Sequence, residues 1–286
     1  MKYVELVPGV KSSVLGFGCA PILGAVDRKR SIRALEVALE EGITHFDVAP
    51  SYGFGEAESL VGSFLQGKRN EVVLATKFGI EVSPIASIAR PLKSSVRLAR
   101  KLLKSLKGSK TEVSGSSATP SIVANLHKHV PITGPALAAS FERSLKRLRT
   151  DYIDFLFLHD PSDTLSRPDD VLEELRKLKQ AGKLRGTGIA VMAANLPAHV
   201  AYIDQFDIIQ FEVPQTRTSY DEARLARSNK PCVLFSPFRA RGSGKVFGPE
   251  TTSGDLLKGL AGDYPLAVIL CSMFSEGHLR ENSRVF

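Results

Sequence analysis

The sequence has few of the features that mark secreted or metal-binding proteins. Among its 286 residues there are only three cysteines, and they lie far apart at Cys19, Cys232 and Cys271. An odd number of widely spaced cysteines argues against a disulfide framework, and none of the spacings is typical of a metal site. We therefore expect reduced thiols in or near strands, and no bound metal ion.

Long apolar runs are also missing. No stretch of 18 apolar residues occurs, so the sequence has no segment of the length that a membrane-spanning helix requires. The first residues, MKYVELVPGV, lack the basic start, apolar middle and small-residue cleavage site of a signal peptide. We therefore expect a cytoplasmic protein. With 43% hydrophobic residues, the chain can bury a sizeable core as one domain over residues 1–286.

What the sequence does contain is a regular alternation of two kinds of segment. Short apolar or β-branched runs occur at residues 13–20, 44–49, 72–77, 152–159, 184–191, 206–212, 232–237 and 266–271. Segments with helical periodicity lie between them, most clearly at residues 30–42, 56–67, 136–150 and 168–183. Eight such strand and helix pairs predict an α/β fold, a closed parallel (β/α)8 TIM barrel, preceded by an N-terminal β-hairpin.

Four polar residues fall where such a barrel carries its functional groups, at the carboxyl ends of the strands and in the loops that follow. Asp47 and Tyr52 follow the second strand, Lys77 ends the third, and His159 ends the fourth. Each residue alone has an ordinary structural explanation as a cap, a solvated strand end or a hydrogen-bonded histidine. Together they indicate a site, because a buried lysine or aspartate is costly unless the two pair.

These four residues belong to longer motifs that resemble those of the aldo-keto reductase family. The matching stretches are GFG at 16–18, FDVAPSYGFGEAE at 46–58, VLATK at 73–77, DYIDFLFLHD at 151–160, AGKLRGTGIA at 181–190, FDIIQFE at 206–212, FSPFRARG at 235–242 and GHLREN at 277–282. The resemblance covers the chain from about residue 3 to its end, apart from residues 81–135. It implies an NAD(P)H-dependent oxidoreductase that reduces an aldehyde, ketone or sugar-like carbonyl, or runs the reverse reaction, with Asp47, Tyr52, Lys77 and His159 as its catalytic residues.

The chemistry of carbonyl reduction explains why those residue types are needed. The carbonyl oxygen must receive a proton, and the phenol of Tyr52 is the expected donor. Its ordinary pKa is about 10, so we expect the ammonium of Lys77 to bring that pKa closer to neutrality. Asp47 would hold the lysine by an ion pair, and His159 would donate a hydrogen bond to the substrate oxygen.

The resemblance also implies a set of dinucleotide-binding residues. They are Gly18, Cys19, Gln210, Ser236, Phe238, Arg241, Ser272, His278, Glu281 and Asn282. Arginines at positions 239, 241 and 280 favour NADP(H) over NAD(H), because a 2'-phosphate requires a cation. Ala190 and Val191 replace the family's Ser-Asn pair, and Val213 replaces an aromatic residue. The loss of two hydrogen bonds to the nicotinamide carboxamide would weaken binding by roughly 1 to 3 kcal/mol.

The net charge of +8 is concentrated in the segment that interrupts the resemblance. Residues 81–135, after the third strand, hold nine cations and two anions, a local net of +7. Residues 92–106 predict an amphipathic basic helix, and the Ser- and Gly-rich residues 107–121 predict flexibility. Two interpretations of this segment are left open. It forms a lid over the barrel, or it contacts a membrane surface or an anionic partner through residues 90–110. Nucleic acid is not expected, because no aromatic residues interleave with the charges.

Two functional classes remain open at this point. The intact set of catalytic residues favours an enzyme, and the altered carboxamide pocket favours a catalytically weak barrel that binds a nucleotide or a protein partner. The last helix begins close to Phe286, so we expect a short or absent C-terminal loop and an open substrate site. We expect a monomer. His127 and His129 are interpreted as loop residues, since no acid or cysteine accompanies them at ligand spacing.

Overall fold

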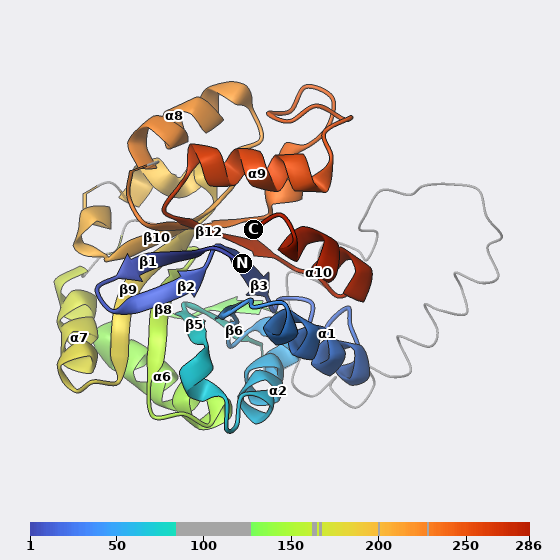
Figure 1. Ribbon diagram of the computed structural model, residues 1–286. Coiled ribbons are helices and arrows are strands. Elements are labelled where there is room, and N and C mark those ends of the chain that lie inside the picture. Colours follow the sequence, from blue (N-terminus) through green and yellow to red (C-terminus); the bar gives the residue numbers. More distant parts are fainter. Residues whose placement is uncertain (84–126, 162–164, 166–167, 200, 228) are drawn as a thin grey trace.

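The computed structural model describes residues 1–83, 127–161, 165, 168–199, 201–227 and 229–286 (Figure 1). Parallel strands close into a barrel in the cyclic order β3, β4, β5, β8, β9, β10, β11, β12. Their bounds are Leu15–Gly18, His45–Asp47, Val73–Phe78, Ile153–His159, Leu184–Val191, Ile208–Glu212, Cys232–Phe235 and Ala267–Cys271. The predicted (β/α)8 TIM barrel is confirmed.

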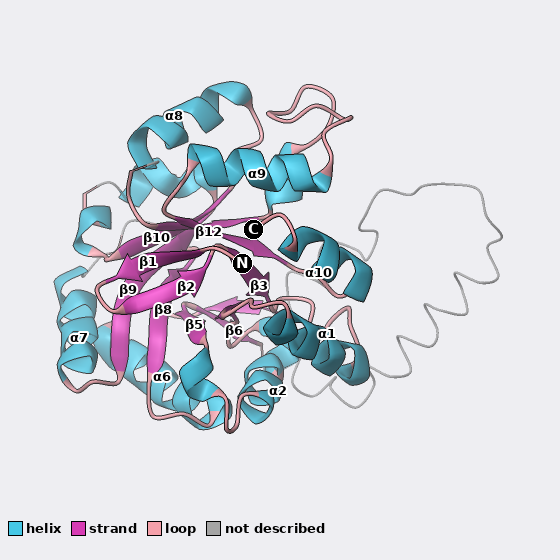
Figure 2. Cartoon of the chain, viewed as in Figure 1, coloured by secondary structure: helices cyan, strands magenta, loops and turns pink. Residues whose placement is uncertain are grey.

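Helices surround the barrel on its outside (Figure 2). In the described residues they are α1 Arg28–Glu40, α2 Ala57–Phe64, α6 Gly134–Leu148, α7 Pro168–Gln180, α8 Arg217–Arg227, α9 Ser253–Asp263 and α10 Glu276–Ser283. Helix α6 illustrates how the sequence defines an element. The Thr133 hydroxyl caps its start by accepting from the Ala136 amide at 3.4 Å. Leu137, Phe141 and Leu145 then form a buried stripe at helical spacing.

The expectation of eight strand and helix pairs is wrong at one place. Between β9 and β10 the described residues form only two short 3-10 helices, η4 Ala193–His199 and η5 Ile203–Gln205. Pro197 lies inside η4. Proline has no backbone N–H and clashes with the preceding turn, which disfavours an α-helix there. No helix in the described part of the chain has the length and apolar character needed to cross a membrane.

Two short antiparallel ribbons accompany the barrel. The predicted N-terminal hairpin is confirmed as β1 Tyr3–Val7 and β2 Val10–Ser13. Its Leu6 and Val10 pack into the barrel interior. The second ribbon, β6 Ile80–Val82 with β7 His127–His129, flanks the basic segment after β5. The predicted helix over residues 92–106, the Ser- and Gly-rich residues 107–121 and the proposed contact region 90–110 lie outside the described residues.

Side chains alternate between the barrel interior and the layer under the helices. The interior cluster contains Val73 and Ala75 of β5 with Phe155 and Phe157 of β8. Gly186 and Gly188 of β9 make room for these rings: an added Cβ would lie 2.4 Å from the Phe155 ring and 2.5 Å from the Phe157 ring. The phenylalanines and the glycines therefore fill the interior as complementary shapes.

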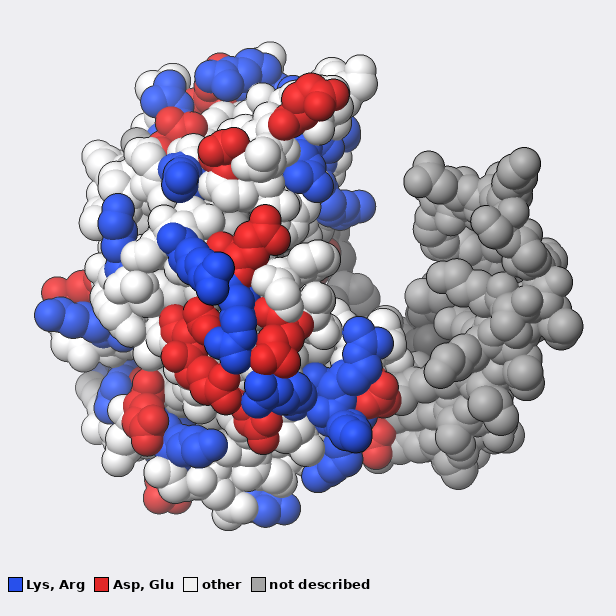
Figure 3. All heavy atoms as spheres, turned by 45° about the vertical axis from the view of Figure 1, so that its right-hand side comes forward, with Lys and Arg blue, Asp and Glu red and all other residues white. Residues whose placement is uncertain are grey.

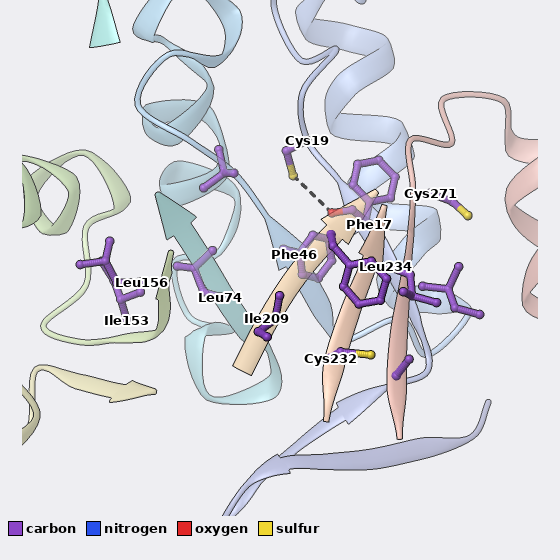
Figure 4. Close-up of a cluster of buried hydrophobic side chains, with 14 of the residues drawn as sticks. Phe17, Cys19, Phe46, Leu74, Ile153, Leu156, Ile209, Cys232, Leu234 and Cys271 are labelled. Carbon is purple, nitrogen blue, oxygen red and sulfur yellow. Dashed lines mark hydrogen bonds between the residues drawn. The ribbon is translucent and has the colours of Figure 1, made fainter. Parts of the chain in front are cut away.

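The outer layer contains Phe17, Phe46, Leu74, Ile153, Leu156, Ile209 and Leu234 (Figure 4). Cys19, Cys232 and Cys271 lie in the same buried layer as free thiols, within or directly after strands. This agrees with the predicted reduced cysteines. Burial raises the pKa of Cys232 and Cys271 to about 12, so both thiols stay protonated near neutral pH.

Charges of both signs mingle on the face drawn in Figure 3. Among the ion pairs of the described surface, Arg33 and Arg280 pair with acidic residues of α1 and α10, including Glu40 and Glu276. This agrees with the sequence, in which residues outside the 81–135 segment carry a net charge of only +1 because the total is +8 and that segment accounts for +7.

Candidate active site

The alternation along the strands aims the predicted catalytic side chains into the barrel mouth. Asp47, Lys77 and His159 are the last inward positions of β4, β5 and β8, each two residues beyond an inward-facing neighbour. Gln210 has the corresponding position in β10, two residues after Ile208. Four side chains from separate strands thus meet at the carboxyl end of the barrel.

Lys77 and Asp47 form a buried ion pair, with both residues 3% exposed. Lys77 Nζ also donates to the Val48 carbonyl at 3.4 Å, and Gln210 Nε2 donates to Asp47 Oδ2 at 3.1 Å. Burial lowers the pKa of Lys77, but Asp47 and Tyr52 outweigh it, so the net pKa is raised. The lysine is therefore an ammonium at neutral pH.

Tyr52 reaches the same point from the loop after β4, where a sharp turn redirects the chain. Gly53 and Phe54 have left-handed backbone angles, with φ of 59° and 60°. An added Cβ at Gly53 would lie 2.4 Å from the Ile22 carbonyl oxygen, so only glycine fits there. Lys77 Nζ lies 5.3 Å from the centre of the Tyr52 ring, and the His159 ring meets it edge-on at 6.0 Å.

The electrostatics of Tyr52 differ from the expectation. Burial raises the pKa of its hydroxyl, and this effect exceeds the lowering by Lys77, so the net pKa is above the ordinary value. Lys77 acts in the predicted direction, but the predicted net decrease is wrong because the phenol is removed from water. In this state Tyr52 is a protonated phenol, which is the form that a proton donor requires.

His159 is held in its neutral form. Burial lowers its pKa well below the ordinary value, and the positive charge of Lys77 adds to that effect. Its Nδ1 is buried and has no hydrogen-bond partner among the described residues. A neutral imidazole carries one N–H, so His159 can donate one hydrogen bond to an oxygen near Tyr52.

Two cavities adjoin these side chains. The first, of about 420 Å³, extends over the ends of β9 to β12, and the second, of about 490 Å³, lies towards the β6–β7 ribbon. Tyr52, His159, Ala20 and Ile80 line both. The Tyr52 hydroxyl and the His159 ring therefore stand on the boundary between two spaces, each large enough for part of a small molecule.

Several of the expected dinucleotide residues line the first cavity. They are Gly18, Gln210, Ser236, Phe238 and Ser272. Gln210 Oε1 is buried without a partner among the described residues, although its Nε2 is bonded. Ser272 Oγ donates to the Gly18 carbonyl at 3.0 Å, so the two strands that carry them are joined at the rim. Ala190 and Val191 line the same wall.

The remaining expected residues lie elsewhere. Cys19 is fully buried behind Asp47, and Arg241 donates to the Thr251 carbonyl at 3.2 Å. His278 and Glu281 are exposed on α10. Asn282 is buried, with Nδ2 3.3 Å from Met273 Sδ, so its amide faces the protein interior and not a cavity.

Three ionisable residues that line the cavities were not predicted from the sequence as site residues. Asp160 follows His159 and lines the first cavity, where its Oδ1 accepts from Asn195 Nδ2 at 3.2 Å. Its position directly after the end of a strand could have identified it, because functional residues of such barrels lie there. His127 and His129, interpreted as loop residues, belong to strand β7 and line the second cavity. Their spacing of two residues, the period of a strand, was a signal only that both share one face of a strand.

Comparison with known proteins identifies the family. The sequence model described as the aldo/keto reductase family matches residues 14–216. The chain belongs to the aldo/keto reductase family. This family comprises oxidoreductases, and the four candidate catalytic residues all fall inside the matched region.

Individual relatives are more distant. Aldo-keto reductase YhdN from Bacillus subtilis is 28% identical over 275 residues, which cover 90% of this chain and 69% of YhdN. Several other curated relatives are matched over about half of their own length. Aldo-keto reductase AKR11C1 from Bacillus halodurans, in its holo form, has a TM-score of 0.70 with 21% identity, covering 100% of this chain and 90% of that one. An aldo-keto reductase from Klebsiella pneumoniae in complex with NADPH has a TM-score of 0.64 with 19% identity, covering 99% and 89%. These two structural similarities concern the fold.

Proposed function

We propose that this aldo/keto reductase uses NAD(P)H to reduce an aldehyde, ketone or sugar-like carbonyl to an alcohol, or catalyses the reverse, with Tyr52 as proton donor. The observation that carries the proposal is the buried Lys77–Asp47 pair beside Tyr52 and His159, at the boundary between two cavities. Burying two charges costs free energy, and such buried pairs are often found at functional sites. This pair lies beside the protonated phenol of Tyr52.

The first cavity fits the nicotinamide end of a dinucleotide. Gln210 Oε1 is a buried acceptor without a partner among the described residues, and a carboxamide N–H would satisfy it. Asp160 lines the same cavity and offers a second acceptor where Ala190 and Val191 offer no side-chain hydrogen bond. Ser236, Phe238 and Ser272, which follow strands β11 and β12, also line this cavity. When bound, the dinucleotide supplies the hydride that reduces the carbonyl carbon.

The chain's own groups manage the proton and the developing charge. Tyr52 transfers its proton to the carbonyl oxygen as that oxygen becomes negative. The phenolate left behind faces the ammonium of Lys77, which Asp47 and Gln210 hold in place. His159 donates a hydrogen bond that orients the carbonyl oxygen towards Tyr52. In the direction of alcohol oxidation the same groups take the proton back.

Preference for NADP(H) is proposed because one arginine is available for the 2'-phosphate. Arg280 is held by Glu40, Glu41 and Glu276, and Arg239 pairs with Glu212 at 2.6 Å. Arg241 has no carboxylate partner in the described ranges, and it lies near Ser253 at the start of α9, with 3.5 Å between the guanidinium and Oγ. An arginine beside a helix N-terminus favours an anion. NAD(H), which lacks this phosphate, is the alternative cofactor.

A single barrel domain over residues 1–286, acting as a monomer on a small carbonyl or alcohol, completes the proposal. A second candidate function is a barrel that binds a nucleotide or a protein partner with little turnover. The specific observation in its favour is the replacement of the family's Ser-Asn pair by Ala190 and Val191 at the cavity wall.

A direct assay distinguishes the two candidates. The protein is mixed with NADPH or NADH and a reactive aldehyde, and the loss of nicotinamide absorbance is followed. Turnover that requires both components supports the reductase, with a lower KM for NADPH than for NADH. Dinucleotide binding without turnover across a panel of aldehydes and ketones would instead support the binding role.

A further inference from the structure

The second cavity carries a group of histidines that the catalytic residues do not account for. Its lining combines Tyr52 and His159 with His127 and His129 from strand β7. Ala20, Gly24, Ser51, Gly53, Phe54 and Ile80 supply the rest. The two β7 histidines are exposed at the outer side of the cavity, so they face any molecule that enters towards Tyr52.

Strand alternation places both histidines on the cavity side. In the β6–β7 ribbon His129 pairs with Ile80, and Ile80 also lines the cavity. His127 is two residues from His129 and shares its face. Lys128 lies between them and pairs with Glu81 on the opposite face of the ribbon.

The opposite face is directed at helix α6. Glu81 accepts there from Arg143 of α6 at 2.5 Å and from the Ser140 hydroxyl at 3.5 Å. The charged side chains of Glu81 and Arg143 therefore lie on the face away from the cavity, and strand alternation places Lys128 on that same face. The ribbon presents imidazoles, and no fixed charge, to the space in front of Tyr52.

The ionisable side chains that line this space include no carboxylate, ammonium or guanidinium group among the described residues. In the described ranges they are the three histidines and Tyr52, and no acidic side chain lines the cavity. Lys77 of β5 lies behind Tyr52 and His159, where Asp47 neutralises it. The described residues contain no group of three or more His, Cys, Asp or Glu side chains arranged to hold a metal ion, so metal ligation does not explain the cluster.

We propose that the second cavity holds the end of the substrate distal to the carbonyl, and that His127 and His129 select substrates with an anionic group, such as a carboxylate, at that end. This inference rests on the proposed function, since it describes the substrate of the same site. An imidazole that gains a proton becomes a cation with two N–H donors, so it binds a carboxylate by a charge-assisted hydrogen bond.

Binding of an anionic substrate by these histidines should depend on pH. Partial removal of the His127 ring from water lowers its pKa, and neighbouring His129 lowers it further, so without an anion the neutral ring is favoured. A bound carboxylate favours the protonated ring instead. Binding of the anionic substrate therefore takes up a proton, and its affinity falls as the pH rises through the histidine range.

The test compares 4-carboxybenzaldehyde with its neutral methyl ester, methyl 4-formylbenzoate, as substrates of the full-length protein with NADPH. The two substrates have the same reacting group, so protonation changes at Tyr52 and His159 affect both kcat/KM values equally. The ratio of the two values is therefore independent of those changes. We expect the ratio to favour the acid at about pH 6 and to fall about tenfold by about pH 8, mainly through KM, as one charge-assisted hydrogen bond is lost.

Matched variants locate the effect. His127→Gln with His129→Gln keeps hydrogen-bonding capacity but cannot gain a proton, and it should remove both the preference and its pH dependence. Lys128→Gln removes a full charge from the other face of the same strand and should leave both intact. Equal ratios at the two pH values in the unaltered protein, or loss of the preference in Lys128→Gln alone, would overturn the inference while leaving the reductase function in place. Reduction of neither aldehyde would overturn both.

Discussion

Gln210 Nε2 donates a hydrogen bond of 3.1 Å to Oδ2 of Asp47, the carboxylate that also pairs with Lys77. The two residues are far apart in sequence and lie on β10 and β4, which are not neighbours in the barrel. The bond therefore spans the mouth and fixes which way the Gln210 amide points. Its Oε1 is directed away from Asp47 and is left for another donor.

Replacement of Gln210 tests that consequence. Gln210→Met keeps the side-chain length but removes the acceptor, so the Kd for NADPH should rise about tenfold, as expected for one buried hydrogen bond. The Kd is measured by fluorescence titration. Gln66→Met is the control, because in the described part of the chain the Gln66 side chain accepts only from the exposed Arg149 on the outer surface. An unchanged Kd in Gln210→Met would show that its amide does not hold the dinucleotide.

The Lys77–Asp47 pair should support both folding and catalysis. Lys77→Met leaves the Asp47 carboxylate buried without its cation, and the free energy of unfolding should fall by about 3 to 5 kcal/mol. Carbonyl reduction should be lost as well. The double variant Lys77→Met with Asp47→Leu removes both charges, and urea denaturation should show part of the stability restored while activity stays absent. A double variant less stable than Lys77→Met would contradict this account of the pair.

Cofactor preference should depend on one arginine. Arg241→Ala should raise the KM for NADPH about tenfold and leave the KM for NADH nearly unchanged, because only NADPH carries the 2'-phosphate. Arg280→Ala makes the same change in charge at a residue already paired with three glutamates, and it should alter neither KM. Equal effects of Arg241→Ala on the two cofactors would mean that the phosphate is bound elsewhere.

Buried His45 should make stability depend on pH. Burial, with a smaller effect of Lys77, lowers its folded pKa to about 3, whereas the unfolded value is about 6.5. Below the unfolded pKa only the unfolded state takes up a proton, so the protein loses stability as the pH falls. Between about pH 7.5 and about pH 5.5 the loss from this residue is about 1.4 kcal/mol. Urea denaturation at both pH values should show a correspondingly smaller loss for His45→Leu; an identical loss would contradict the assignment.

The barrel was predictable because its signals are local and repeated. Each strand is a short apolar run. Because side chains alternate between the two faces of a strand, the sequence also predicts that Asp47, Lys77 and His159 point into the barrel. The described residues between β9 and β10 form no α-helix, which was harder to predict because a single proline, Pro197, interrupts the regular alternation of strands and helices.

Other features of the site depend on the three-dimensional surroundings. The raised pKa of Tyr52 results from burial, which no motif encodes. The burial of the Asn282 amide against Met273 Sδ depends on a contact that the motif does not specify. The place of His127 and His129 required the pairing of β7 with β6, two strands separated by the residues from 83 to 126. Contacts across such a sequence separation cannot be read from either strand alone.

The most direct test of the account is carbonyl reduction by Tyr52→Phe. The substitution removes one hydroxyl and keeps the ring that packs against His159 and Lys77. We predict that Tyr52→Phe abolishes NADPH-dependent reduction of a reactive aldehyde. The Kd for NADPH, measured by fluorescence titration, should stay within a few fold, because only the proton donor is gone. Turnover by Tyr52→Phe at a rate close to that of the unaltered protein would contradict the central claim that Tyr52 supplies the proton.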